Sequence, residues 1–599
     1  MAFQFVLDMY KFLLEILADI DWGGSTPRLI KPRAPRQRDD SKPSLNNLGD
    51  YLIMIIFEQV CLESPRSMNN LALVSSHYYH IARYCRHREI SLNISESNKD
   101  WLQKQLAYIV KSGLSSAVRR INMRGHEDQE NVEAVLQFLQ KTTGLRDLEW
   151  LNDGPPISSI GVPEKVIVAL RPRKLVRLHA SLKQETIQIN KPVPKFISPL
   201  QIGCENLYSL RMCLSFSPDT ASGMIQILKR ILLSSPNVRR LAINQGNRRR
   251  GCDPRPHLGY FGLGFVDGER SPALEELELH KYVFGTHGQL GVESVRYTHS
   301  GERCPGREEE DYWVETFDWS RLRKLRTDER DFALKLAPKL ISLDEASFTE
   351  CPEDTDDSYP RKFFREFYGA VANAPSTVIL PTFSSLGVDG IIEQASKLKV
   401  LRIHRHQSVG WAARTIDAPS LHKIQEECPL IEELVLDIKR QDDWPYEILD
   451  ILAGFRKLRS LTIWFELLQD GRTNGDFIRP HLTYFAAEKL FIYIRSRRPS
   501  SFLPLKKLKL HCGTKRWRGD LLQGRWPRSN VSTYVCQPSE NCDEAADGMF
   551  TITCLELKKH ENAILERMRC NGEAAPADLS TGLRIAINGP MILDELDED

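Results

Sequence analysis

A short pattern of apolar positions recurs along most of the chain from about residue 140. Each copy has an apolar residue, two variable residues, a leucine, one variable residue and a further apolar residue. The full copies are 145–150, 175–180, 207–212, 238–243, 274–279, 398–403, 431–436, 458–463 and 505–510. Two weaker copies, 322–327 and 340–345, have a polar residue at the last apolar place. Because apolar and variable positions alternate, each copy predicts a short strand with one buried face.

Segments with helical periodicity precede several of these copies, for example residues 224–235 and 446–455. A repeated helix, turn and short strand is typical of a leucine-rich repeat solenoid. Ordinary amphipathic strands in an α/β protein are the alternative, and the number of full copies favours the solenoid. The copies lack the Asn or Cys that regular leucine-rich repeats place after the strand, so we expect an irregular solenoid over residues 93–535. Glycine and charge replace the apolar pattern at 244–272 and 284–318, which predicts loops inserted between repeats.

The pattern changes at both ends of the chain. Phe3, Val6, Tyr10 and Leu13 begin an apolar stripe that predicts an amphipathic helix, packed on the protein itself, on a partner or on a membrane surface. The expected segments outside the repeats are this helix (1–24), a basic proline-rich linker (25–44), a helical segment (45–92) and a C-terminal segment (536–599) with strand-like residues 550–557 and an acidic end at 593–599. A nuclear-import signal is the alternative for the linker.

Composition excludes several classes of protein. With 81 basic and 79 acidic residues the formal net charge is +2, so no overall basic field attracts nucleic acid, and Arg248, Arg249 and Arg250 are interpreted as a solvated run. No stretch of about 18 uncharged apolar residues predicts a membrane span. The 13 cysteines contain no CxxC pair, which fits a reducing compartment, cytoplasmic or nuclear. We expect neither nucleic acid nor membrane as a partner.

Motifs for catalysis are absent from the sequence. It contains no GxxxxGK[ST], GxGxxG, GxSxG or HExxH. His404 and His406 would share one face of a strand, but no cysteine or carboxylate is placed to complete a metal site with them. The expectation is a non-enzymatic protein without cofactor or metal. An enzyme of unrecognised type is an alternative that would need a pocket with converging titratable groups.

Residues 48–82 carry a more specific pattern. LGDYLIMIIFEQV (48–60) is followed by LALVSSHYYHIA (71–82). This arrangement resembles the F-box family, whose motif runs Leu-Pro-x-Glu-Leu-Leu, then Ile-Phe and an apolar residue, and later Leu-x-x-Val-Ser, an aromatic residue and Ala. Gly49 stands where that motif has proline, and Tyr51 where it has glutamate.

The resemblance implies an adaptor role. F-box proteins, including many fungal ones with leucine-rich repeats, bind a Skp-type adaptor of a cullin–RING (SCF-type) ubiquitin ligase and hold a target protein through the repeats. The residues that it assigns to adaptor binding are Leu48, Leu52, Ile53, Ile56, Phe57, Val60, Leu71, Val74, Ser75 and Tyr78. A leucine-rich repeat scaffold without a ligase role is the alternative, in which 45–92 only caps the repeats.

The expected fold class is therefore α/β, with a small helical F-box-like segment followed by an irregular leucine-rich repeat solenoid. Strand residues between the apolar positions should point away from the core and form the surface that binds the target. On this face we expect Arg211, Arg240, Glu278, Arg402, His404, Asp437, Trp464 and Lys509. Its mixed charge favours a protein or peptide over a phosphate backbone. An exposed Trp464 would be a binding hot spot, unless a neighbouring loop covers it.

Overall fold

The computed structural model describes residues 50–63, 67–94, 99–124, 129–151, 162–183, 199–214, 218–245, 262–265, 268–280, 282, 284, 309–348, 358–404, 415–440, 443–465, 480, 482–512, 532–538 and 550–554. The expected N-terminal helix (1–24), the linker (25–44), the run Arg248–Arg250 and the acidic end (593–599) lie outside these residues. So do Leu48, Gly49 and His406. The chain divides into two units, the first ending at Pro272 and the second beginning at Ala273.

The first unit begins with three short helices, α2 (Asp50–Glu63), α3 (Ser67–Val74) and α4 (Ser76–Arg86). Ser75 separates α3 from α4 because its extended backbone and its hydroxyl cap the second helix, accepting a hydrogen bond from the Tyr78 N–H at 3.1 Å. The helices enclose a small apolar core of their own around Phe57, Leu71 and Tyr78. The two or three helices expected over 45–92 are therefore present.

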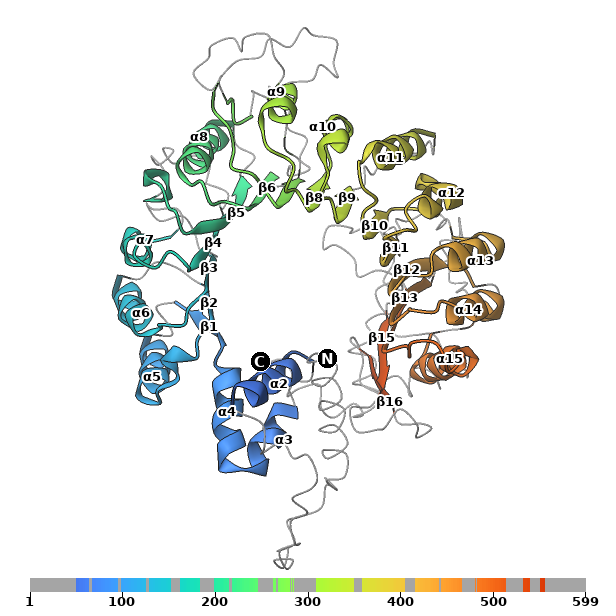
Figure 1. Ribbon diagram of the computed structural model, residues 1–599, viewed down its shortest axis with the longest axis horizontal. Helices are drawn as coiled ribbons and strands as arrows, with labels where there is room; N and C mark the ends of the chain where they lie inside the picture. Colours follow the sequence, from blue (N-terminus) through green and yellow to red (C-terminus); the bar gives the residue numbers. More distant parts are fainter. Residues whose placement is uncertain are drawn as a thin grey trace, which may run out of the picture. The chain divides into compact units, whose positions relative to one another are not determined.

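The rest of the first unit alternates strands with helices. Its parallel strands run in sequence order, each pairing with the next: β1 (Glu89–Asn93), β2 (Arg120–Arg124), β3 (Asp147–Leu151), β4 (Arg177–Lys183), β5 (Leu207–Leu214) and β6 (Arg240–Gln245). The helices between them lie on one side of the strands (Figure 1): α5 (Lys99–Lys111), α6 (Gln129–Lys141), α7 (Glu164–Leu170) and α8 (Pro218–Ser234), with short 3₁₀ turns η3 (Leu114–Ser116) and η4 (Pro199–Ile202).

The second unit continues the same alternation. Its parallel strands are β7 (Glu276–His280), β8 (Lys324–Thr327), β9 (Glu345–Phe348), β10 (Thr377–Leu380), β11 (Val400–Ile403), β12 (Glu433–Ile438), β13 (Ser460–Phe465) and β14 (Lys507–Cys512). Two antiparallel strands follow, β15 (Ser532–Pro538) and β16 (Phe550–Cys554). The helices are α9 (Glu309–Thr316), α10 (Arg330–Leu336), α11 (Ser358–Ala370), α12 (Gly387–Ile392), α13 (Ala418–Glu427), α14 (Tyr446–Ala453) and α15 (Tyr484–Arg497), with 3₁₀ turns η5 (Ala337–Lys339) and η6 (Phe383–Ser385).

One backbone arrangement repeats at the start of the strands. The N–H groups of Arg146 and Asp147 both donate to the Arg119 carbonyl, at 2.8 and 3.0 Å. In the second unit the N–H groups of Arg459 and Ser460 donate in the same way to the Glu432 carbonyl, at 2.8 and 3.1 Å. These shared acceptors hold successive turns in register. The expected α/β class is confirmed, with mostly parallel strands in sequence order.

Most expected strands are confirmed, and two copies of the pattern were misassigned. The copy at 340–345 is out of register: Leu343, Ala346 and Phe348 are its buried residues, and β9 begins only at Glu345. Two leucines three residues apart made both registers fit the pattern. In the copy at 175–180, Leu175 is 91% exposed and Val176 is buried in its place.

Other elements were missed or misplaced. β2 overlaps a copy of the pattern that was not predicted, VRRINM (118–123). Before β10, Pro375 stands where the pattern has its first apolar residue. The loop expected at 284–318 contains α9, in which the apolar residues Tyr312, Trp313 and Val314 are buried. β15 crosses the segment boundary expected at 535/536, since its pairing with β14 joins it to the sheet. The strand expected at 550–557 is present from Phe550 to Cys554.

Candidate protein-interaction surfaces

The predicted adaptor-binding residues fall into two groups in the helical segment. Six lie in the core that α2, α3 and α4 share: Ile53, Ile56, Phe57, Val60, Leu71 and Tyr78. The Phe57 and Tyr78 rings meet edge to face, with centroids 5.5 Å apart. These six residues hold the helices together and offer little surface to a partner, because burial gives each of them contacts within the segment.

Exposed apolar side chains surround this core. Leu52 and Val74, both predicted, are exposed, and so are Leu73 and Tyr79, which the sequence did not single out. Leu73 is 74% exposed and Val74 is 51% exposed. Ser75 is exposed as well, with its hydroxyl engaged as the cap of α4. Adaptor binding stays a prediction, and direct contact would fall to this exposed group.

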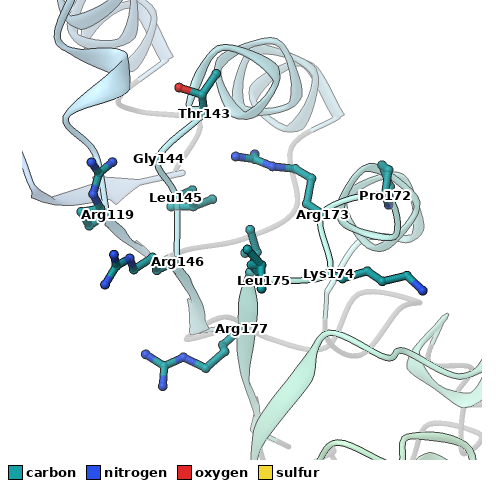
Figure 2. Close-up of a pocket in the computed structure, with 11 residues that line it drawn as sticks. Arg119, Thr143, Gly144, Leu145, Arg146, Pro172, Arg173, Lys174, Leu175 and Arg177 are labelled. Carbon is teal, nitrogen blue, oxygen red and sulfur yellow. The ribbon is translucent and has the colours of Figure 1, made fainter.

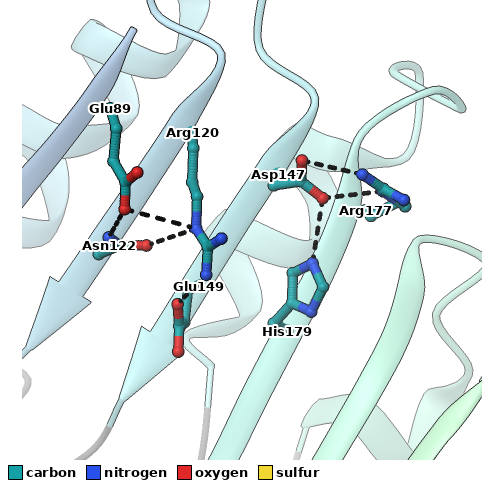
Figure 3. Close-up of polar contacts among 7 residues, drawn as sticks. All are labelled: Glu89, Arg120, Asn122, Asp147, Glu149, Arg177 and His179. Atoms are coloured by element: carbon teal, nitrogen blue, oxygen red, sulfur yellow. Dashed lines mark hydrogen bonds and ion pairs between the residues drawn. The ribbon is translucent and has the colours of Figure 1, made fainter. Parts of the chain in front are cut away.

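We call the side of the strands that faces away from the helices the open strand face. In the first unit it carries a network of paired polar side chains (Figure 3). Arg120 donates to Glu149 at 2.7 Å and to Asn122 at 3.0 Å, and Asn122 donates to Glu89 at 2.7 Å. These residues come from three neighbouring strands, and the Arg120–Glu149 and Asn122–Glu89 pairs each join two of them. None of the four was predicted. In the sequence these four residues share one feature: each lies beside an apolar residue that is buried in a strand.

A second part of that network lies on β3, β4 and β5. Arg177 and His179 both contact the Asp147 carboxylate, at 2.8 and 3.1 Å. Burial alone would raise the pKa of Asp147, but the hydrogen bonds from Arg177 and His179 bring it below its ordinary value. Tyr208 sits at a bulge between β4 and β5, with the guanidinium groups of Arg177 and Arg240 at 5.1 and 5.4 Å from its ring.

The predicted residues of the first unit lie on this face. Arg211 and Arg240 are exposed, and the strand residues beside them, Leu210 and Leu241, are buried. Glu278, on β7 of the second unit, is half-buried between the buried Leu277 and Leu279. The alternation of faces expected from the sequence therefore holds in both units.

The open face of the second unit brings two predicted residues, His404 and Trp464, into one stack of rings with His511. The Trp464 ring lies between the rings of His404 and His511, with centroids 4.0 and 3.7 Å away and planes within 14° and 7° of parallel. The His404 ring nitrogen Nδ1 lies 2.6 Å from an oxygen of Asp437. His511 Nδ1 lies 3.0 Å from the Thr533 hydroxyl. We call His404, Asp437, Trp464, His511 and Thr533 the stacked row.

The stacked row changes the interpretation of two predicted residues. Trp464 is half-buried, and the two imidazole rings cover both faces of its ring, so only part of it faces outward. Asp437 is buried although it belongs to the open face, because His404 covers it. Beside the row, Arg402 pairs with Glu433 at 2.8 Å and Lys509 is half-buried. Three of the predicted side chains, His404, Asp437 and Trp464, therefore hold one another in position.

Burial in the stacked row keeps His511 neutral. It lowers the pKa of His511 to about 3, helped by the nearby charges of Lys509 and His404. The unfolded chain binds a proton at His511 with an ordinary pKa of about 6.5. The folded state therefore binds fewer protons than the unfolded state between these values. The free energy of unfolding is therefore unaffected by protonation of His511 above pH 6.5, and it decreases as the pH falls from 6.5 toward 3.

This linkage predicts the effect of replacing His511. Between pH 7 and pH 4.5, His511→Gln should lose about 2–3 kcal/mol less stability than the wild-type chain, because glutamine does not titrate. Urea unfolding at the two pH values, followed by tryptophan fluorescence, measures the difference. His422→Gln, at an exposed site on α13, is the matched control and should follow the wild type. Equal acid sensitivity of wild type and His511→Gln would contradict the assignment.

Comparisons with known proteins add no family: no family model matches the chain, and no curated protein matches it. Across the described ranges, no helix has the length and apolar character needed to cross a membrane. Within the same part of the chain, no group of three or more His, Cys, Asp or Glu side chains is placed to hold a metal ion. The candidate surfaces are therefore the exposed apolar group of α2–α4 and the open strand faces.

Proposed function

We propose that this chain is a substrate-recognition subunit of an SCF-type cullin–RING ubiquitin ligase. In this proposal α2–α4 form an F-box that binds a Skp-type adaptor, and through it the cullin. The strand and helix repeats form an irregular leucine-rich repeat solenoid that binds a target protein. A leucine-rich repeat scaffold without a ligase role is the second candidate, since the repeats alone would serve it equally.

The observation that carries the proposal is the construction of the helical segment. Six of the residues that match the F-box pattern form its core, and Ser75, in the most specific part of the pattern, caps α4. The segment still leaves Leu52, Leu73, Val74 and Tyr79 exposed. Exposed apolar side chains on short helices support a helix-to-partner surface.

The open strand faces support the second half of the proposal. A row of alternating acidic and basic side chains, with fixed aromatic rings among them, suits a protein ligand with patterned charge. Arg402 paired with Glu433 and Trp464 held between two imidazoles are preorganised, so binding costs little side-chain entropy.

Co-purification from cells tests the adaptor half. Val74→Asp and Leu73→Asp each place a charge on the exposed apolar group without entering the core. If this group is the adaptor interface, each variant should weaken adaptor binding by about 2 kcal/mol or more, roughly 30-fold, which abolishes recovery of the adaptor and the cullin. Proteins bound through the repeats should still be recovered.

The control is Val168→Asp on α7, because Val168 is 50% exposed and lies outside the helical segment. It should retain the adaptor at the wild-type level. Recovery of repeat-bound proteins without any adaptor, from wild-type chain, would instead support the scaffold.

A further inference from the structure

Three arginines surround one turn of the first unit, the turn at residues 142–146 between α6 and β3. Arg146 belongs to the turn itself and is exposed. Arg119 reaches it from the preceding turn, and its guanidinium occupies the space above Gly144, where a Cβ atom would lie 1.4 Å from Nη1. Arg173 reaches back from the following turn and donates to the carbonyl oxygens of Leu139, at 2.8 Å, and Thr142.

These three arginines line an open hollow together with Thr143 and Leu175 (Figure 2). No Asp or Glu is among the described residues that line it. In Figure 2, Arg119 and Arg146 extend to the same side of the turn, whereas Lys174 extends away from them. The hollow therefore concentrates positive charge around the exposed Thr143 hydroxyl and Arg146.

Neutral oxygens are the acceptors for two of these guanidinium groups. Arg119 donates to the Ser116 carbonyl at 2.8 Å, and Arg173 donates to the helix carbonyls and to the Thr142 hydroxyl. Within the described part of the chain, none of the three forms an ion pair. Burial lowers the pKa of Arg173, as expected for a half-buried cation without a carboxylate beside it. The turn thus holds three positive charges, none of which pairs with a carboxylate among the described residues.

The residues that precede the strands of other repeats have different charges or partners. Arg88, Arg119 and Arg146 precede residues paired across β1, β2 and β3, so they occupy one register position on strands about 4.8 Å apart. Arg88 forms an ion pair with Glu58.

In the second unit this register position alternates in sign from β7 to β9 and again from β11 to β13. Glu275, Arg323 and Asp344 precede β7, β8 and β9, and Arg323 pairs with Asp344 at 2.7 Å. Lys399, Glu432 and Arg459 alternate in the same way before β11, β12 and β13. Cross-strand neighbours of like charge destabilise a sheet, and those of opposite charge stabilise it. The run at Arg119 and Arg146 departs from this alternation, and Arg459 and Lys506, which precede β13 and β14, form a second pair of cationic neighbours.

We propose that Arg119, Arg146 and Arg173 form a binding site for one oxyanion group of a ligand, a phosphate or a carboxylate. Guanidinium groups present fixed pairs of N–H donors that match both kinds of oxyanion. The site spans a single turn and three cations. That fits one charged group on a peptide, whereas a nucleic acid backbone would engage a longer row of cations. The site stands independently of the proposed ligase role.

Titration calorimetry of the full chain at constant ionic strength tests the site. The probes are pyrophosphate, a phosphoserine peptide, an Asp-rich peptide and single-stranded DNA of random sequence. We expect saturable binding of an oxyanion probe, weakened about tenfold by Arg146→Gln and about a hundredfold by Arg119→Gln with Arg146→Gln. Tighter binding of the phosphoserine peptide would assign the ligand group as phosphate, and tighter binding of the Asp-rich peptide would assign it as carboxylate.

Arg323→Gln is the matched control, because Arg323 has the same register position but is already paired with Asp344. It should leave the affinity unchanged. Arg173 is kept in all variants, since it holds the carbonyl groups at the end of α6. Absence of saturable binding to the wild-type chain at millimolar probe would overturn the proposal. So would an affinity that the double variant retains, or DNA binding tighter than that of every other probe.

Discussion

Phe57→Ala is expected to lower the free energy of unfolding of the α2–α4 segment by about 3–5 kcal/mol, the usual cost of removing a buried aromatic ring. Phe57 is fully buried, and it packs edge to face on Tyr78 within the core of the segment. Three short helices have few other apolar contacts to compensate, since helices of this length are marginal in isolation. The loss is therefore comparable to the whole stability of a small segment.

Hydrogen exchange of the full chain measures this effect. Amide groups of α2–α4 should lose protection in Phe57→Ala, while those of β11–β14 should keep theirs. Leu73→Ala is the control, because Leu73 is 74% exposed and its truncation should change stability by less than about 0.5 kcal/mol. Wild-type protection of α2–α4 in Phe57→Ala would show that the segment does not depend on this core. Loss of adaptor binding in Phe57→Ala would accordingly report unfolding, so surface variants are needed to locate the interface.

Trp464→Ala should cost the second unit about 2–4 kcal/mol, less than a fully buried tryptophan because one part of the ring faces outward. Its ring contacts His404 on one side and His511 on the other. Aromatic pairs contribute about 0.5–1.5 kcal/mol each beyond the apolar area that they bury. Removing the ring would also expose His511, which the folded chain keeps buried and neutral.

Urea unfolding of the second unit measures the cost, with hydrogen exchange of β12–β14 to place it. Trp101→Ala is the matched control, since Trp101 is 53% exposed on α5 and no described aromatic ring stacks on it. That variant should stay within about 0.5 kcal/mol of the wild type. If both tryptophan variants lost equal stability, the stack would have no special contribution.

The sequence predicted the strands better than the contacts between them. Buried positions such as Leu434 and Leu461 follow directly from the repeated pattern, because one face of each strand must meet the helices. The pattern failed where two registers were both apolar, as at Leu340 and Leu343, and where Pro375 replaced the first apolar residue. Local apolar spacing does not distinguish such cases, since the choice depends on packing against neighbouring repeats.

The outward direction of the polar residues was also predictable, but not their partners. Arg402 and Trp464 point away from the core as expected, because strand residues alternate between faces. That Trp464 stacks on His511 depends on the register of β13 against β14, which no single repeat encodes. The uncompensated Arg119 and Arg146 likewise appear only when successive turns are placed side by side.

Binding of the purified full chain to a purified Skp-type adaptor, measured by titration calorimetry, tests the proposed function most directly. We expect saturable binding at micromolar concentration or tighter in the wild-type chain and in Val168→Asp. Binding should be lost in Val74→Asp while α2–α4 keep their protection from hydrogen exchange. A wild-type chain that shows no saturable binding, or a folded Val74→Asp variant that binds as tightly as the wild type, would contradict the proposed function.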